Sequence, residues 1–199
     1  MSNIRMDGVE SDPVHLIRMA WEKACRELPV HGLPPRSALA GTAIAGALHA
    51  CFLLTRDAAW GWRFRYAGRS LSALTGEEPE RLPFGAIFEP GTRGRIAACL
   101  EAVTSDRARA ELSLTEGGCE RRMVLLPLAP DAAGRPLILG AIQSVAGNRR
   151  PAANGTPLLS LGTMRLVPAE ESKVIRVTFG RPIPCARPDG ADGLYTRRS

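Results

Sequence analysis

The sequence predicts an α+β domain with a five-stranded antiparallel sheet, helices on one face of that sheet, and one further helix before it. Four aromatic residues fall on every second position, as in a half-buried strand: Trp60, Trp62, Phe64 and Tyr66. Residues 107–115 alternate apolar and polar side chains in the same way. Between these two strands lie short helical segments, and this strand–helices–strands order is typical of an α+β domain.

The first expected element is a helix over residues 13–28. Asp12 suits the N-cap, Pro13 suits the first helical position, and Pro29 ends the helix. Apolar side chains form one stripe at spacings of three and four: Val14, Ile17, Trp21, Ala24 and Leu28. Such a helix could cover its own sheet or pair with a second subunit, and the sequence leaves both interpretations open.

A short helix is expected next, over residues 38–48. It lies in an uncharged segment, residues 37–55, that is long enough for a membrane-spanning helix. This segment is rich in Ala, Gly and Thr and contains His49, which disfavours insertion into a bilayer. We therefore predict no membrane span.

The five strands are expected at residues 49–55, 60–67, 107–115, 121–129 and 136–146. The last two are apolar on both faces, unlike strands of a sheet with one solvated face. Their outer face therefore needs a cover, and the helix at 13–28 is the expected one. Prolines restrict residues 69–90 to short helical pieces, and an amphipathic helix follows over residues 93–104.

The charge is concentrated near the C-terminus. Of the formal net charge of +6, residues 146–199 contribute nine Arg and Lys against four Asp and Glu, a net of +5. Short apolar runs at 158–162 and 174–179 could add a strand or dock elsewhere. The last twenty residues hold Pro, Arg and Gly with little to bury, and we expect them to be disordered.

The pattern F-x-Y-A-G-x-x-L-x-x-L-x-G begins at Phe64 and ends at Gly76, and it resembles the strand-to-helix entry of a PAS domain. It is most similar to the divergent PAS group common in alphaproteobacterial proteins, a former domain of unknown function. The residues that carry the resemblance are Phe64, Tyr66, Ala67, Gly68, Leu71, Leu74, Gly76, Phe84, Ile87, Phe88, Pro90 and Arg93. The resemblance runs from about Trp21 to about Asn148.

The resemblance implies three parts for this chain. Residues 1–48 would be an N-terminal helical extension and residues 49–146 the PAS-like domain. Residues 147–199 would form a basic, partly disordered C-terminal extension rich in Pro, Arg and Gly. The remaining residues are too few for an output domain, so we expect a stand-alone module.

A PAS-type ligand pocket would lie between the sheet and the helices. Its expected lining is Trp62, Phe64, Tyr66, Leu74, Phe84, Phe88, Ile96 and Leu100. The same side chains would also serve as a plain hydrophobic core. Haem-binding PAS domains usually use a helix histidine, and none follows His49. Flavin-binding light sensors use a cysteine motif where this chain reads Leu82–Phe88 without cysteine. The cofactor is left unknown.

Catalytic and metal sites are not predicted. His15, His31 and His49 all precede most of the sheet and lack ligand spacing for a metal. No Gly-x-Ser-x-Gly motif occurs, and the five cysteines are widely spaced, as expected for reduced thiols in the cytoplasm.

The sequence thus predicts a cytoplasmic, bacterial, homodimeric sensor or adaptor for an unknown signalling protein, in which a small apolar ligand is an open option. The alternatives are an enzyme that uses the pocket and, less favoured, nucleic-acid binding through the tail.

Overall fold

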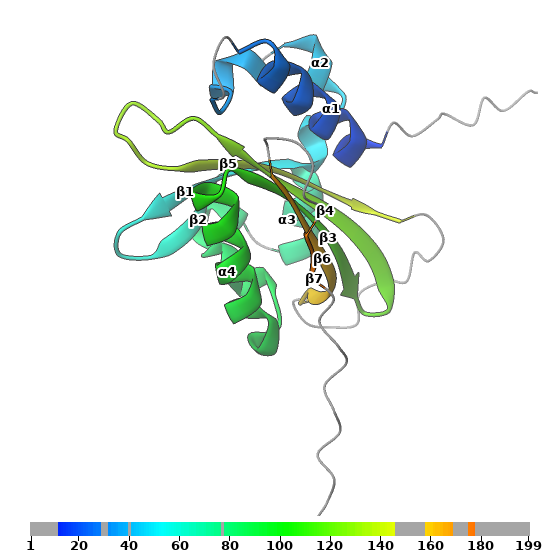
Figure 1. The fold of residues 1–199 in the computed structure, drawn as a ribbon. Coiled ribbons are helices and arrows are strands. Elements are labelled where there is room, and N and C mark those ends of the chain that lie inside the picture. Colours follow the sequence, from blue (N-terminus) through cyan, green and yellow to red (C-terminus); the bar gives the residue numbers. More distant parts are fainter. Residues whose placement is uncertain are drawn as a thin grey trace, which may run out of the picture.

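An antiparallel sheet separates two helical layers in the computed structural model of the chain (Figure 1). The structure describes residues 12–28, 32–39, 41–76, 78–145, 158–168 and 175–177. On one face of the sheet lie α1 (Pro13–Arg26) and α2 (Thr42–Ala45), and on the other lie α3 (Arg69–Thr75) and α4 (Pro90–Ser105). Short 3-10 helices complete these layers: η1 (Arg36–Leu39), η2 (Leu48–Ala50), η3 (Pro79–Arg81) and η4 (Phe84–Ile87).

The five expected strands are present as β1 (Cys51–Asp57), β2 (Gly61–Ala67), β3 (Ala108–Glu116), β4 (Cys119–Leu128) and β5 (Leu137–Ser144). The prediction that the sheet stops at five strands is wrong. Strand β6 (Ser160–Pro168) and the three-residue β7 (Ile175–Val177) extend it, in the order β2-β1-β5-β4-β3-β6-β7. Strand β6 pairs with β3 from Ala108↔Pro168 to Thr115↔Ser160, so part of the C-terminal extension belongs to the sheet.

Strands β4 and β5 are apolar on both faces because each face has its own core. On the inner face, Met123, Leu125 and Ile138 pack with residues of α3 and α4. On the outer face, Val124, Leu126, Leu128, Leu137, Leu139 and Ala141 pack with Ile17, Trp21 and Ala24 of α1. The prediction that the first helix covers this outer face is therefore confirmed.

Helix α1 is held on the sheet by polar as well as apolar contacts. Asp12 caps it as predicted, because its side chain accepts a hydrogen bond from the backbone N–H of His15 at 2.8 Å. The indole Nε1 of Trp21 donates to the carbonyl of Pro127 at 2.8 Å. The backbone N–H of Val14 donates to Oε1 of Gln143 at 3.1 Å. These bonds fix the position of α1 along β4 and β5.

The four-residue aromatic face predicted for β2 is interrupted at both ends. Trp60 precedes the strand and is 66% exposed. Phe64 pairs with Leu54, but Tyr66 pairs with Leu53, so Arg65 between them is an extra residue in the ladder. A bulge of this kind shifts the alternation by one position. Tyr66 therefore lies on the outer face with Leu53, whereas Trp62 and Phe64 belong to the inner core.

Candidate functional site

Seven of the eight predicted pocket residues lie together in the inner core. They are Trp62, Phe64, Leu74, Phe84, Phe88, Ile96 and Leu100, and all seven are buried. The eighth, Tyr66, lies on the opposite face and is 43% exposed. The structure therefore brings all of the expected lining residues together except Tyr66.

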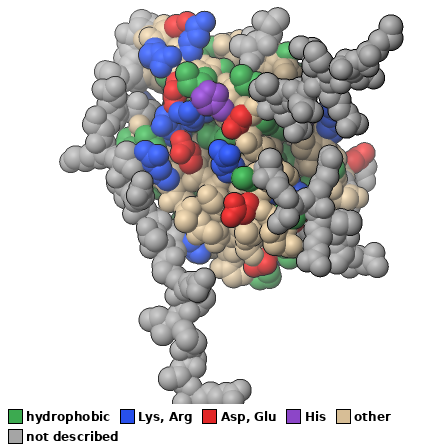
Figure 2. Space-filling view, turned by 90° about the vertical axis from the view of Figure 1, so that its right-hand side faces the viewer, with side chains coloured by type: hydrophobic (Ala, Val, Ile, Leu, Met, Phe, Trp, Pro, Cys, Tyr) green, Lys and Arg blue, Asp and Glu red, His purple; other side chains and the backbone are tan. Residues whose placement is uncertain are grey.

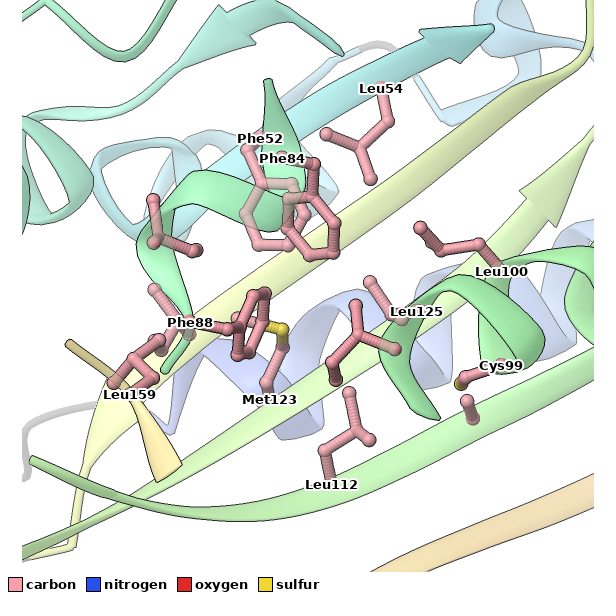
Figure 3. Close-up of a cluster of buried hydrophobic side chains, with 14 of the residues drawn as sticks. Phe52, Leu54, Phe84, Phe88, Cys99, Leu100, Leu112, Met123, Leu125 and Leu159 are labelled. Atoms are coloured by element: carbon pink, nitrogen blue, oxygen red, sulfur yellow. The ribbon is translucent and has the colours of Figure 1, made fainter. Parts of the chain in front are cut away.

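Four phenylalanine rings form the centre of this inner cluster. Phe84 lies 5.6 Å from Phe52, 5.4 Å from Phe64 and 5.2 Å from Phe88 between ring centroids. Edge-to-face geometry dominates, as is favourable for aromatic pairs. Figure 3 shows the rings of Phe52, Phe84 and Phe88 among aliphatic side chains from the sheet and from α4. At these distances the rings are in contact with one another.

Other members of the cluster were not in the predicted lining, and Phe52 and Leu159 are two of them. Phe52 lies in β1, and its ring occupies the space above Gly140, where a Cβ would come within 2.1 Å of the ring. The apolar character of β1 was the available signal. Leu159 comes from the C-terminal extension, and its N–H donates to the carbonyl of Ile87 at 2.9 Å. Its carbonyl accepts from the N–H of Glu89 at 3.0 Å. Nothing local in the sequence indicated this contact.

The inner cluster offers little chemistry. Among the described residues, the buried polar side chains are Thr75 and Thr92, and the Thr75 hydroxyl donates to the carbonyl of Leu71 at 3.1 Å. Burial raises the pKa of the Cys99 thiol to about 12, so it is not a nucleophile at neutral pH. The indole Nε1 of Trp62 is buried and has no hydrogen-bond partner within the described part of the chain. That donor could serve a ligand, whereas the cluster supplies no acid or base for catalysis.

Enlarging Phe88 tests whether the inner cluster is filled. We expect Phe88→Trp to lower the free energy of unfolding by about 1–3 kcal/mol, because Phe88 is fully buried and contacts the Phe84 ring. Urea denaturation of both proteins measures this difference. A variant as stable as the wild type would show that the cluster contains free space, as a ligand pocket requires.

Two hollows open on the other side of the sheet. The first, which we name the arginine cleft, has a volume of about 700 Å³ and lies between α1 and strands β3, β4 and β6. Its charged lining is Asp12, Arg18, Arg109, Glu111, Arg122 and Arg165, and the imidazole of His15 also borders it. Figure 2 shows basic and acidic side chains gathered around a histidine on one face of the molecule.

Ion pairs connect the two walls of the arginine cleft. Glu22 of α1 bonds Arg109 of β3 at 2.6 Å and Arg18 of its own helix at 3.0 Å. The remaining pairs are longer: Arg109 lies 3.4 Å from Glu111, Arg165 lies 3.8 Å from Glu111, and Arg122 lies 3.9 Å from Asp12. The cleft therefore has one tight pair that joins α1 to β3, and looser pairs among the strands and at the N-cap of α1.

The second hollow, which we name the outer pocket, has a volume of about 360 Å³. It lies between η1, α2 and η2 on one side and the outer face of β1, β4 and β5 on the other. Its lining is Arg36, Leu39, Gly41, Ile44, Leu48, Cys51, Leu53, Tyr66, Leu128 and Leu139. Of the eight predicted residues, only Tyr66 lines it.

No metal-binding or membrane-spanning feature is found in the described ranges. No group of three or more His, Cys, Asp or Glu side chains there could hold a metal ion. The ring Nδ1 of His15 lies 3.3 Å from Nη2 of Arg18. His31 falls outside the described residues. No helix in this part of the chain is both long and apolar enough to cross a membrane.

Comparison with known proteins identifies the family. A family model for the PAS domain matches residues 9–143, which includes α1 and all of β1 to β4. The same comparisons found no match among curated proteins or among solved structures. PAS domains in general are sensory and signalling modules rather than enzymes, and they often mediate protein interactions. Because the match spans more than half of the sequence, this chain belongs to the PAS domain family.

Proposed function

We propose that this chain is a cytoplasmic sensory or adaptor module that acts as a homodimer through protein–protein contacts and has no catalytic centre. Its family supports the sensory class in general. The observation that carries the finer proposal is the way α1 lies on the sheet. Its apolar stripe is buried on the protein's own outer face, yet Met19 of the same helix stays 41% exposed. Leu16 and Ala20, which are partly buried and stand at helical spacing on the same side of α1, adjoin Met19. An apolar patch of this kind on a docked helix suits contact with a second subunit.

The two sides of helix α1 are held to the sheet differently. Its packing combines buried apolar side chains with an ion-pair edge, Glu22 with Arg109, that borders the arginine cleft. A signal would act on α1 only by favouring its docked or its undocked state through unequal affinity. The arginine cleft is open beside this edge, so the sheet does not cover that side of the helix.

The absence of a catalytic centre is proposed from the chemistry of the described residues. The inner cluster is apolar, and burial raises the pKa of Cys51 to about 12 and, with help from Glu22, the pKa of Cys25 to about 11. Cys25, Cys51 and Cys99 are free thiols, which supports a reducing compartment. No observation favours the enzyme alternative. Residues 147–199 lie mostly outside the described part, and nothing favours nucleic-acid binding through them.

Two matched substitutions test the proposed homodimer. Met19→Glu places a charge on the exposed side of α1, and Trp60→Glu places the same charge at an exposed apolar residue before β2. Native mass spectrometry over a concentration series should show a dimer for the wild type and for Trp60→Glu. For Met19→Glu, we expect the dissociation constant of the dimer to rise at least about tenfold, which corresponds to about 1.4 kcal/mol of binding free energy.

The opposite pattern would contradict this interface. If Trp60→Glu dissociates the dimer and Met19→Glu does not, the contact lies at the β1–β2 hairpin. A wild type that remains monomeric at every concentration would remove the homodimer from the proposal.

A further inference from the structure

The outer pocket has apolar walls drawn from both layers of the molecule. Leu39 of η1 and Ile44 of α2 lie on the helical side, and Leu53 of β1, Leu128 of β4 and Leu139 of β5 lie on the sheet side. The leucines at its base are buried, whereas Leu48, also part of the lining, is 43% exposed. A concave apolar site of about 360 Å³ is within the range of small-ligand pockets.

Arg36 is the charged side chain in this lining. Within the described part of the chain, it has no ion pair and no hydrogen bond. The arginines of the arginine cleft differ in this respect, because each of them lies within 4 Å of an acidic side chain. A guanidinium that has no carboxylate partner can bind the charged group of an amphipathic anion, and the apolar hollow beside it can bind the apolar part of the same molecule.

The other polar groups of the pocket already have partners. The thiol of Cys51 donates to the carbonyl of Ala47 at 3.0 Å, and the hydroxyl of Tyr66 donates to the carbonyl of Leu48 at 3.2 Å. Neither hydrogen is free for a ligand. The donors available to a charged headgroup are therefore those of Arg36.

From this arrangement we infer that the outer pocket binds an amphipathic monocarboxylate, with the apolar chain against the leucines and the carboxylate on Arg36. A single guanidinium matches one negative charge, and its fork fits a carboxylate in two hydrogen bonds. A doubly charged phosphate would keep an unpaired charge at the pocket. The bulge at Arg65 takes part in forming this site, because it turns Tyr66 toward the outer face.

This inference does not depend on the proposed signalling role. The site is built from the segment between α1 and β1 together with the sheet, and binding can be measured without reference to dimerisation. A failure to bind would leave the homodimer intact, and a monomeric protein could still bind the ligand.

Calorimetric titration of the full chain tests the site with three probes that share one apolar tail. They are octanoate, 1-octanol and octylammonium, measured at neutral pH. Octanoate should bind at least about tenfold more tightly than octanol, as expected for a charge-assisted hydrogen bond, and octylammonium should bind most weakly. In Arg36→Gln the advantage of octanoate over octanol should disappear. In the matched control Arg56→Gln, whose arginine pairs with Glu101 away from the pocket, it should remain.

A second variant locates the apolar chain. Ile44→Trp narrows the pocket and should weaken the binding of octanoate and of octanol alike. If Ile44→Trp does not fold, Arg36→Gln still decides the test, because Arg36 is exposed and its replacement leaves the core intact. Equal binding of octanoate and octanol by the wild type, an unchanged preference in Arg36→Gln, or no binding at millimolar concentration would each overturn the inference. Binding to anionic phosphatidylglycerol vesicles that needs Arg36, without binding of octanoate, would replace it with a membrane-surface contact.

Discussion

Replacing Trp21 with alanine should lower the free energy of unfolding by about 3–5 kcal/mol. The indole is only 2% exposed and packs in the outer core between α1 and the sheet. Truncation leaves a cavity there and also removes the donor to the carbonyl of Pro127. Urea denaturation followed by circular dichroism measures the loss as a lower midpoint at an unchanged slope.

Trp60→Ala is the matched control for this substitution. Trp60 is also a tryptophan, but it is largely exposed, so its truncation should change stability by no more than about 0.5 kcal/mol. If both variants were equally stable, α1 would contribute little to the folded state. The packing of α1 on the outer face would then not be what stabilises the fold.

Gly68→Ala should be almost as damaging, with an expected loss of about 3 kcal/mol, at the upper end for overpacking. A Cβ at Gly68 would lie 2.4 Å from the carbonyl oxygen of Leu48 and 2.5 Å from that of His49. Both are backbone atoms, which cannot move aside as a flexible side chain can. The N–H of Gly68 donates to the carbonyl of Cys51 at 2.8 Å, so moving the backbone of residue 68 away from this contact would break a hydrogen bond.

Gly94→Ala provides the opposite expectation within the same protein. Gly94 lies inside α4, and a Cβ there meets no atom within 4 Å. Alanine is the better helix former, so this variant should gain about 0.5–1 kcal/mol. Thermal unfolding of both variants beside the wild type checks the pair. A Gly68→Ala protein that melts at the wild-type temperature would show that the backbone near η2 yields easily.

Features that depend on local patterns were predictable from the sequence. The cap at Asp12, the stripe of α1 and the two-faced apolar character of β4 and β5 follow from spacing alone, and together they predicted which surface α1 covers. Seven buried members of the inner cluster were also predicted, because strand alternation and helix spacing place them on one side.

What could not be predicted depends on pairing between distant segments. A single extra residue, Arg65, reverses the direction of Tyr66, and nothing in the alternating sequence marks that residue as a bulge. The sequence left open whether the apolar run at 158–162 adds a strand or docks elsewhere, and only the pairing of β6 with β3 decides this. The outer pocket combines residues from seven elements, so no single stretch of sequence reveals it.

The position of β6 has a consequence for the boundaries of the domain. The family match ends at residue 143, before β6 begins at Ser160. A fragment cut at that boundary would leave the whole length of β3 as a sheet edge with unpaired N–H and C=O groups. It would also remove Leu159, Leu161 and Met164 from the inner core. A long edge beside exposed apolar side chains is a template for pairing with other chains. Residues beyond the family boundary therefore act as the edge protection of this sheet.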